Sequence, residues 1–191
     1  MDLIFASSNL HKLIEVKNII KNHKIISLRD LRDYDEVDET GTTFQENAFL
    51  KAKYFFDKYK MPVFADDSGL VVDFLNGEPG VRSARYSGEG ATYQSNNNKL
   101  LKALENVENR KASFITVICY IDEFGVDHYF EGKVDGLITE DFRGENGFGY
   151  DPLFYVPKLG KTFAEMGSIK NTLSHRARAL EGFNQFLNKE V

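Results

Sequence analysis

Apolar runs of strand length alternate with apolar residues at helical spacing in the first part of the chain, and this alternation constrains the fold most. Residues 3–6 and 24–28 are short apolar runs typical of buried strands. Between them, apolar residues recur at helical spacing: Leu10, Leu13, Val16, Ile19 and Ile20. Farther along, the strand-like segments 112–121 and 128–136 follow each other directly across a polar turn at 122–125. Strands and helices alternate early in the chain, and strands follow each other directly later. Together these two patterns favour an α/β fold with a mixed central sheet flanked by helices.

Three further helices are predicted from their apolar stripes, two of them also from a start signal. Thr43 and Glu46 have the spacing of a capping box, so a helix is expected to begin there and to end before Pro62. A third helix is expected over residues 92–107. A last helix is expected to begin near Ser174, and its apolar stripe consists of Ala177, Leu180, Phe183 and Leu187.

The composition limits the classes of partner. Lys and Arg number 24 against 29 Asp and Glu, and the net charge of −5 argues against a surface that coats nucleic acid. The single cysteine, Cys119, excludes an internal disulfide and a Cys-rich zinc site, and its apolar neighbours favour a core position. No stretch has the length of a membrane span, and no basic region precedes the first apolar run. We therefore expect one cytoplasmic domain over residues 1–191, with no nucleic-acid or membrane partner.

A polar turn at residues 7–12 lies between the first predicted strand and the first predicted helix. Such a turn presents free backbone N–H groups and the positive end of the helix dipole, which favour an anion. Ser7, Ser8 and Asn9 are helix-capping residue types, and Lys12 lies one turn into the helix, within reach of a phosphate. The segment lacks the glycines of a Walker A loop. A phosphate site and a plain helix cap with a solvated lysine both remain open.

The helix that begins near Thr43 carries polar residues beside its apolar stripe. Asn47 and Lys51 are four residues apart and therefore share one face. Glu39 lies in the loop before the helix and is a candidate metal ligand, whereas Glu46 has a structural role in the capping box. For Lys51 the alternative is a solvated helix face.

Two aspartates, Asp66 and Asp67, directly follow the strand-like segment 63–65 and precede another at 70–74. The carboxyl end of a strand is where α/β proteins tend to bind ligands, and carboxylates suit Mg²⁺. Adjacent residues of a strand point to opposite faces, so the two aspartates are expected to have different roles. The alternative is an ordinary acidic turn closed by Gly69.

Two turn-rich segments contain candidate ligand-binding residues. Three glycines around Phe148 would let the backbone approach a ligand closely and leave the ring available for stacking, unless Phe148 fills the core. Arg82 and Arg85 lie in the second segment, and either is a candidate phosphate ligand or a surface residue.

Two basic residues, His175 and Arg176, follow the predicted helix cap Ser174. Basic side chains in the first turn of a helix oppose its dipole, so they require another partner. An anionic group or a keto oxygen would supply one.

Together these segments resemble the inosine triphosphate pyrophosphatase family, which acts on non-standard purine nucleotides. The motifs occur in family order from residue 7 to residue 180: 39–48, 65–70, 147–152 and 174–176. The link at residues 166–169, before Lys170, is one residue shorter than is usual in the family.

The resemblance implies a homodimer with a bent, mixed sheet between two lobes and an active-site cleft between the lobes. It implies Mg²⁺-dependent hydrolysis of ITP, dITP and XTP, with Asp67 as general base and with Glu39 and Asp67 as metal ligands. It also implies a set of triphosphate-binding residues: Ser7, Ser8, Asn9, Leu10, His11, Lys12, Lys51 and Lys170.

The resemblance further implies which residues recognise the rest of the substrate. Ser68 would contact the substrate beside Asp67, and Arg85 would be the arginine that faces the cleft. The purine would be enclosed by four consecutive residues: Phe148, Gly149, Tyr150 and Asp151. His175 and Arg176 would donate hydrogen bonds to its 6-oxo group. Two other functions remain open, a pyrophosphatase for pyrimidine nucleotides and a non-enzymatic nucleotide sensor.

Overall fold

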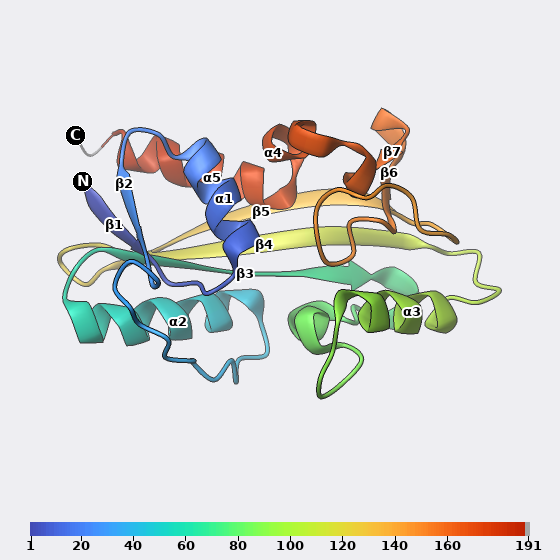
Figure 1. The fold of residues 1–191 in the computed structure, drawn as a ribbon, viewed down its shortest axis with the longest axis horizontal. Coiled ribbons are helices and arrows are strands. Elements are labelled where there is room, and N and C mark those ends of the chain that lie inside the picture. Colours follow the sequence, from blue (N-terminus) through green and yellow to red (C-terminus); the bar gives the residue numbers. More distant parts are fainter. Residues whose placement is uncertain (190–191) are drawn as a thin grey trace. The chain divides into compact units, whose positions relative to one another are not determined.

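The computed structural model describes residues 1–189 and contains, within them, one seven-stranded sheet in the order β2-β1-β3-β4-β5-β6-β7. Strand β1 pairs in parallel with β2 and β3, whereas β6 is antiparallel to β5 and β7 (Figure 1). The strands are β1 Asp2–Phe5, β2 Lys24–Ser27, β3 Val63–Val72, β4 Lys111–Ile121, β5 Asp127–Ile138, β6 Phe154–Val156 and β7 Lys161–Thr162. The predicted α/β fold with a mixed sheet is therefore confirmed. The cleft that the family resemblance implies stays a prediction.

Five α-helices and five 3₁₀ segments accompany the sheet within residues 1–189. The α-helices are α1 Leu10–Ile19, α2 Phe44–Tyr59, α3 Tyr93–Ala103, α4 Lys170–Leu173 and α5 His175–Leu187. The 3₁₀ segments are Asp73–Leu75, Gly80–Arg85, Pro157–Leu159, Phe163–Glu165 and Gly167–Ile169. None of the helices in this part of the chain combines the length and apolar character needed to cross a membrane.

The chain divides into two compact units, each built from segments distant in sequence. The first unit comprises residues 1–67, 116–132 and 176 onward, and the second comprises 68–115 and 133–175. Strands β3, β4 and β5 contribute residues to both units.

In the first unit, the two faces of the sheet are covered by different helices. Helices α1 and α5 lie on one face and α2 lies on the other (Figure 1). Phe64 of β3 belongs to the core cluster that contains Val16 of α1 and Phe183 of α5. Its neighbours Val63 and Ala65 belong instead to the cluster that contains Ala48, Ala52 and Phe55 of α2. Because side chains alternate along a strand, residue 66 continues the face of α1 and α5 and residue 67 continues the face of α2.

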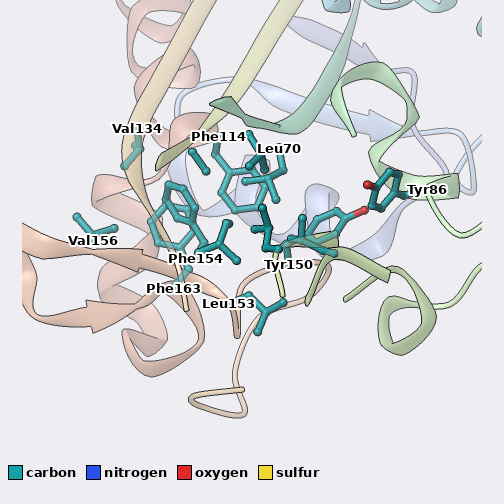
Figure 2. Close-up of a cluster of buried hydrophobic side chains, with 14 of the residues drawn as sticks. Leu70, Tyr86, Phe114, Val134, Tyr150, Leu153, Phe154, Val156 and Phe163 are labelled. Carbon is teal, nitrogen blue, oxygen red and sulfur yellow. The ribbon is translucent and has the colours of Figure 1, made fainter. Parts of the chain in front are cut away.

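The second unit has its own aromatic core, shown in Figure 2. The ring of Phe114 lies 4.7 Å from that of Phe154 and 5.6 Å from that of Phe163. Tyr150 extends from this cluster toward Tyr86 (Figure 2) and donates a hydrogen bond to the carbonyl of Ser83 at 2.6 Å.

Three expectations about the elements are wrong in detail. The strand-like segments 63–65 and 70–74 are not separate, because β3 runs continuously through residues 66–69 over ten residues. The third helix ends at Ala103 rather than at residue 107, since Asn106 has a positive φ and Arg110 donates a hydrogen bond to the Leu104 carbonyl. Leu10, placed on the apolar stripe of the first helix, is 43% exposed because it lies at the first position of α1, beyond the sheet contact.

Candidate active site

The turn between β1 and α1 is organised as a helix N-terminus. Asn9 is the N-cap, and its side chain accepts hydrogen bonds from the N–H groups of His11 and Lys12. The Ser7 hydroxyl accepts one from the Asn9 N–H at 3.2 Å. Ser8, Leu10 and His11 are exposed. The predicted helix cap is confirmed, and Lys12 projects from the first turn.

Asp66 is the centre of a buried ion-pair network on the face of α1 and α5. Its two carboxylate oxygens accept hydrogen bonds from Lys12 Nζ at 3.1 Å and from Arg176 Nε at 3.0 Å. Arg176 also donates to Glu15 through Nη1. All four side chains belong to the first unit. The arrangement holds two cations, Lys12 and Arg176, in fixed positions around one carboxylate.

Asp67 lies on the other face of β3, beside helix α2. Lys51 Nζ is 4.0 Å from Asp67 Oδ1, 2.8 Å from Glu39 Oε1 and 2.8 Å from the carbonyl oxygen of Asp66. One lysine therefore joins the two carboxylates that the sequence singled out as candidate metal ligands. Asp66 and Asp67 therefore have different surroundings, and the expected difference in their roles stays a prediction.

The two aspartates have opposite electrostatic environments. Burial alone would raise the pKa of Asp66, but the charges of Lys12, Arg176 and Lys51 outweigh it and lower the pKa well below its usual range. For Asp67, burial dominates and raises the pKa, and the nearby Glu39 raises it further against the opposing effect of Lys51. A buried carboxylate with a raised pKa is a typical general base.

The donor chemistry of this region fits Mg²⁺. Within residues 1–189 no group of three or more His, Cys, Asp or Glu side chains could by itself enclose a metal ion. Mg²⁺ does not need such a cage, because it is usually held by one or two carboxylates together with waters and substrate phosphates. Glu39 and Asp67 are two carboxylates gathered around Lys51, so they suit an ion that also binds the substrate.

The second unit gathers a different group of candidates around a glycine-rich loop. Lys170 is buried and donates a hydrogen bond to Asp151 Oδ2 at 2.6 Å, and its Nζ lies 4.6 Å from the centre of the Phe148 ring. Asp151 also accepts from the Phe148 N–H at 3.0 Å. Gly147 must be glycine, because its φ is +80° and a Cβ would lie 2.1 Å from Asp151 Oδ2. Despite the short link before it, Lys170 is therefore firmly placed beside the loop expected to enclose the purine.

His175 begins helix α5 and belongs to the second unit, where its ring stacks on Phe114 with ring centres 4.5 Å apart. The Gly149 carbonyl accepts a hydrogen bond from Asn97 Nδ2 at 2.9 Å. Tyr150 is buried. Ser68 is half-buried in β3. The structure thus groups His175 with the aromatic core and Arg176 with the Asp66 network.

Arg82 and Arg85 are exposed residues of the 3₁₀ segment Gly80–Arg85 in the second unit. Together with residues 88–91 they line a surface pocket of about 510 Å³. Arg85 as a substrate ligand stays a prediction.

Two residues of the first unit stand out beyond the sequence-derived candidates. Glu15 completes the Arg176 pair, and the available signal was its spacing of three residues from Lys12 on α1. Asn47 was noted only for sharing a helix face with Lys51, yet it is fully buried and accepts a hydrogen bond from the Gly41 N–H at 2.8 Å.

Fold and site together define a mixed α/β protein in which Lys12, Lys51 and Arg176 surround carboxylates, one of which, Asp67, has a raised pKa. The chain belongs to the Ham1 family, whose model matches residues 3–186. It is 47% identical to a dITP/XTP pyrophosphatase of Thermoanaerobacter sp. (strain X514), over all of this chain and 98% of the relative. A dITP/XTP pyrophosphatase of Clostridium perfringens is 51% identical over 93% of each chain. The structure of the Staphylococcus aureus Ham1 protein matches with a TM-score of 0.91 and 42% identity over the full length of both chains.

Proposed function

We propose that this protein hydrolyses ITP, dITP and XTP to the nucleoside monophosphate and pyrophosphate, with Mg²⁺ as cofactor. The observation that carries the proposal is the arrangement around β3, where Lys12 and Lys51 flank two aspartates of opposite electrostatic character. Relatives named dITP/XTP pyrophosphatase, similar over nearly the whole chain, support the substrate class.

The proposed reaction is an in-line attack by water on the α-phosphorus. Asp67 orients the water and accepts its proton, and the bond from the α-phosphorus to the α–β bridging oxygen breaks, so that pyrophosphate leaves. Lys12 and Lys51 stabilise the negative charge on the phosphate oxygens. Glu39 and Asp67 would hold Mg²⁺, which when bound would supply further positive charge to those oxygens. No covalent intermediate forms, and burial raises the pKa of the Cys119 thiol to about 12, which makes it a poor nucleophile.

The charge balance of the first unit supports a metal requirement. Its network contains the cations of Lys12, Lys51 and Arg176 together with the carboxylates of four residues: Glu15, Glu39, Asp66 and Asp67. A network with more carboxylates than cations does not attract a triphosphate by net charge. A divalent cation would offset the added phosphate charge.

We assign purine recognition to the second unit and to the start of α5. The half-buried ring of Phe148 and the backbone up to Asp151 would enclose the base. His175 and Arg176 would donate hydrogen bonds to the 6-oxo group, which hypoxanthine and xanthine have and adenine lacks. A site built on such donors can reject a mismatched base by as much as about 10⁴-fold.

The remaining site assignments belong to the same proposal. Ser7 to Lys12, Lys51 and Lys170 contact the triphosphate, and Ser68 and Arg85 contact the substrate. Residues 1–191 act as one cytoplasmic domain, as the composition of the chain suggests. Two copies form a homodimer, as the resemblance to the inosine triphosphate pyrophosphatase family implies.

Pyrophosphate release from a panel of triphosphates tests the proposal. ITP and XTP should be hydrolysed far faster than ATP, and chelation of Mg²⁺ should abolish the reaction. Preference for dTTP or UTP would identify a pyrimidine nucleotide pyrophosphatase instead. Binding of ITP without release of pyrophosphate would indicate a sensor.

A further inference from the structure

Asn47 is fully buried at the fourth position of α2, on the helix face that meets β3. Its Oδ1 accepts a hydrogen bond from the Gly41 N–H, two residues after Glu39. Among residues 1–189, its Nδ2 has no hydrogen-bond partner of normal geometry. A buried amide N–H without a partner costs free energy, so its retention calls for a function.

The steric surroundings fix the direction of this amide. A Cβ at residue 41 would lie 2.6 Å from Asn47 Oδ1 and 2.7 Å from the Glu46 Cβ, so only glycine permits the Gly41 contact. With Oδ1 held by Gly41, the Nδ2 group is turned away from the loop. Asp67 shares the face of β3 that packs against α2, and the amide lies close enough to its carboxyl to favour the ionised form.

A second buried asparagine shows what a purely structural amide looks like in this fold. Asn96 also occupies the fourth position of its helix, after the capping box that begins α3. Its Oδ1 accepts from the Ser87 N–H at 2.8 Å, but its Nδ2 donates to the Ala84 carbonyl at 3.0 Å. Both asparagines bind the loop that precedes their helix through Oδ1. Asn96 also donates its amide N–H to a backbone carbonyl, whereas Asn47 does not.

We propose that Asn47 is a positioning residue for the hydrolytic reaction, which anchors the Glu39 loop through Oδ1 and orients the Asp67 side chain through Nδ2. The inference rests on the proposed function, because it assumes that Asp67 acts on the attacking water. Asn47 itself does not touch the substrate. It couples the position of one candidate metal ligand to that of the base.

A double-mutant cycle with Asp67 tests the proposal. Asn47→Ala should lower kcat for ITP by roughly 10-fold or more with little change in KM, because small displacements of catalytic groups are costly. In an Asp67→Asn background the same substitution should cost less than about 2-fold, since residues that act as a unit are not additive. Multiplicative losses in the two backgrounds would overturn the proposal and leave Asn47 a structural residue.

Two further variants keep the test decisive if Asn47→Ala does not fold. Asn47→Asp retains an acceptor for Gly41 but removes the donor, so kcat should fall while the Gly41 amide stays protected from hydrogen exchange. Unchanged kcat in Asn47→Asp would overturn the proposal. The matched control, Asn96→Ala, should lower thermal stability. Any decrease in its kcat should multiply with the decrease caused by Asp67→Asn. If wild-type protein hydrolyses another triphosphate and not ITP, the substrate assignment fails, and the same cycle run with that triphosphate still tests Asn47.

Discussion

The adjacent carboxylates of β3 contribute to stability with opposite sign. Because the pKa of Asp66 is lower in the folded state, its ionisation stabilises the fold at all pH values above its unfolded pKa. That stability is lost only as the pH falls through the lower folded value. For Asp67 the folded pKa is raised, so ionisation of this side chain costs stability above its unfolded pKa. The fold retains a destabilising charge where the proposed base is located.

The first prediction follows from that contrast. Asp67→Asn removes the charge without changing the shape, so turnover of ITP should fall by about 10²-fold or more, the usual scale for a general base. Because ionised Asp67 is unfavourable in the fold, the metal-free variant should unfold at the same temperature as wild type or at a higher one. Pyrophosphate release at saturating Mg²⁺ and thermal unfolding in a chelator measure the two effects. Near-normal turnover would show that another group activates the water.

A second prediction concerns Arg176, which is bound by both Asp66 and Glu15. Arg176→Ala would remove the guanidinium from two buried carboxylates, Asp66 and Glu15, while Asp66 keeps its contact with Lys12, and would destabilise the fold by about 3–5 kcal/mol. Arg176→Lys is the sharper variant, because it keeps the charge and loses the planar geometry of the guanidinium. The ratio of kcat/KM for ITP over ATP should fall, mainly through slower ITP hydrolysis. If the ratio stays at the wild-type value, Arg176 has only its ion-pairing role.

Sequence reasoning identified these residues but not how they are connected. Alternation along a strand was enough to separate Asp66 from Asp67. The partners of Arg176 could not be predicted, because Glu15 is 161 residues away in the chain and meets it only through packing of α1 and α5. Asn47 was missed for a related reason, since full burial of an amide beside a lysine is a property of the fold and not of local spacing.

At the scale of elements, helix α2 organises the loop that carries Glu39. The capping box of Thr43 and Glu46 fixes the start of the helix. Lys58 and Tyr59 near its end both donate hydrogen bonds to Asp33 at the start of the same loop. The loop that carries Glu39 is thus attached to both ends of one helix, although residues 30–41 contain no regular structure.

The third prediction tests this attachment with two matched caps. Thr43→Ala and Thr92→Ala each remove a capping box and should each cost about 1 kcal/mol of stability. Only Thr43→Ala loosens the loop before α2, so only this variant should need more Mg²⁺ for half-maximal activity. Urea unfolding and Mg²⁺ titrations of activity measure the two effects. An equal change in Mg²⁺ requirement in both variants would contradict a specific role for the α2 cap.

Elements with local start signals were predicted well, and those that depend on distant partners were not. Capping boxes begin α2 and α3, and α5 begins at His175, directly after the expected cap Ser174. The polar residues within β3 suggested a turn, because the cations that neutralise Asp66 and Asp67 come from α1, α2 and α5. The short strands β6 and β7, of three and two residues, have no periodicity that a sequence pattern can reveal.

At the scale of the whole molecule, the proposed recognition tasks divide between the two units. The cations assigned to the phosphates, Lys12 and Lys51, belong to the first unit, and the loop 147–151 assigned to the purine belongs to the second. Two assignments cross this division. Lys170 was assigned to the triphosphate but pairs with Asp151 in the second unit, and Arg176 was assigned to the purine but pairs with Asp66 in the first unit. A ligand that contains only the phosphates should therefore report on the first unit, and a ligand that contains only the purine should report on the second.

The fourth prediction uses hydrogen exchange with ligands that represent these parts of the substrate. Inorganic triphosphate with Mg²⁺ should slow exchange in α1 and α2, inosine should slow it in residues 147–151, and IMP should affect both regions. A ligand at 100 times its Kd stabilises the bound state by about 2.7 kcal/mol, which corresponds to roughly 100-fold slower exchange where opening requires release. ATP and adenosine are the matched controls, because adenosine should leave residues 147–151 unprotected at the same concentration as inosine. Protection of residues 147–151 by inorganic triphosphate alone would transfer the phosphate site to the second unit and make Lys170, rather than Lys12, its principal cation.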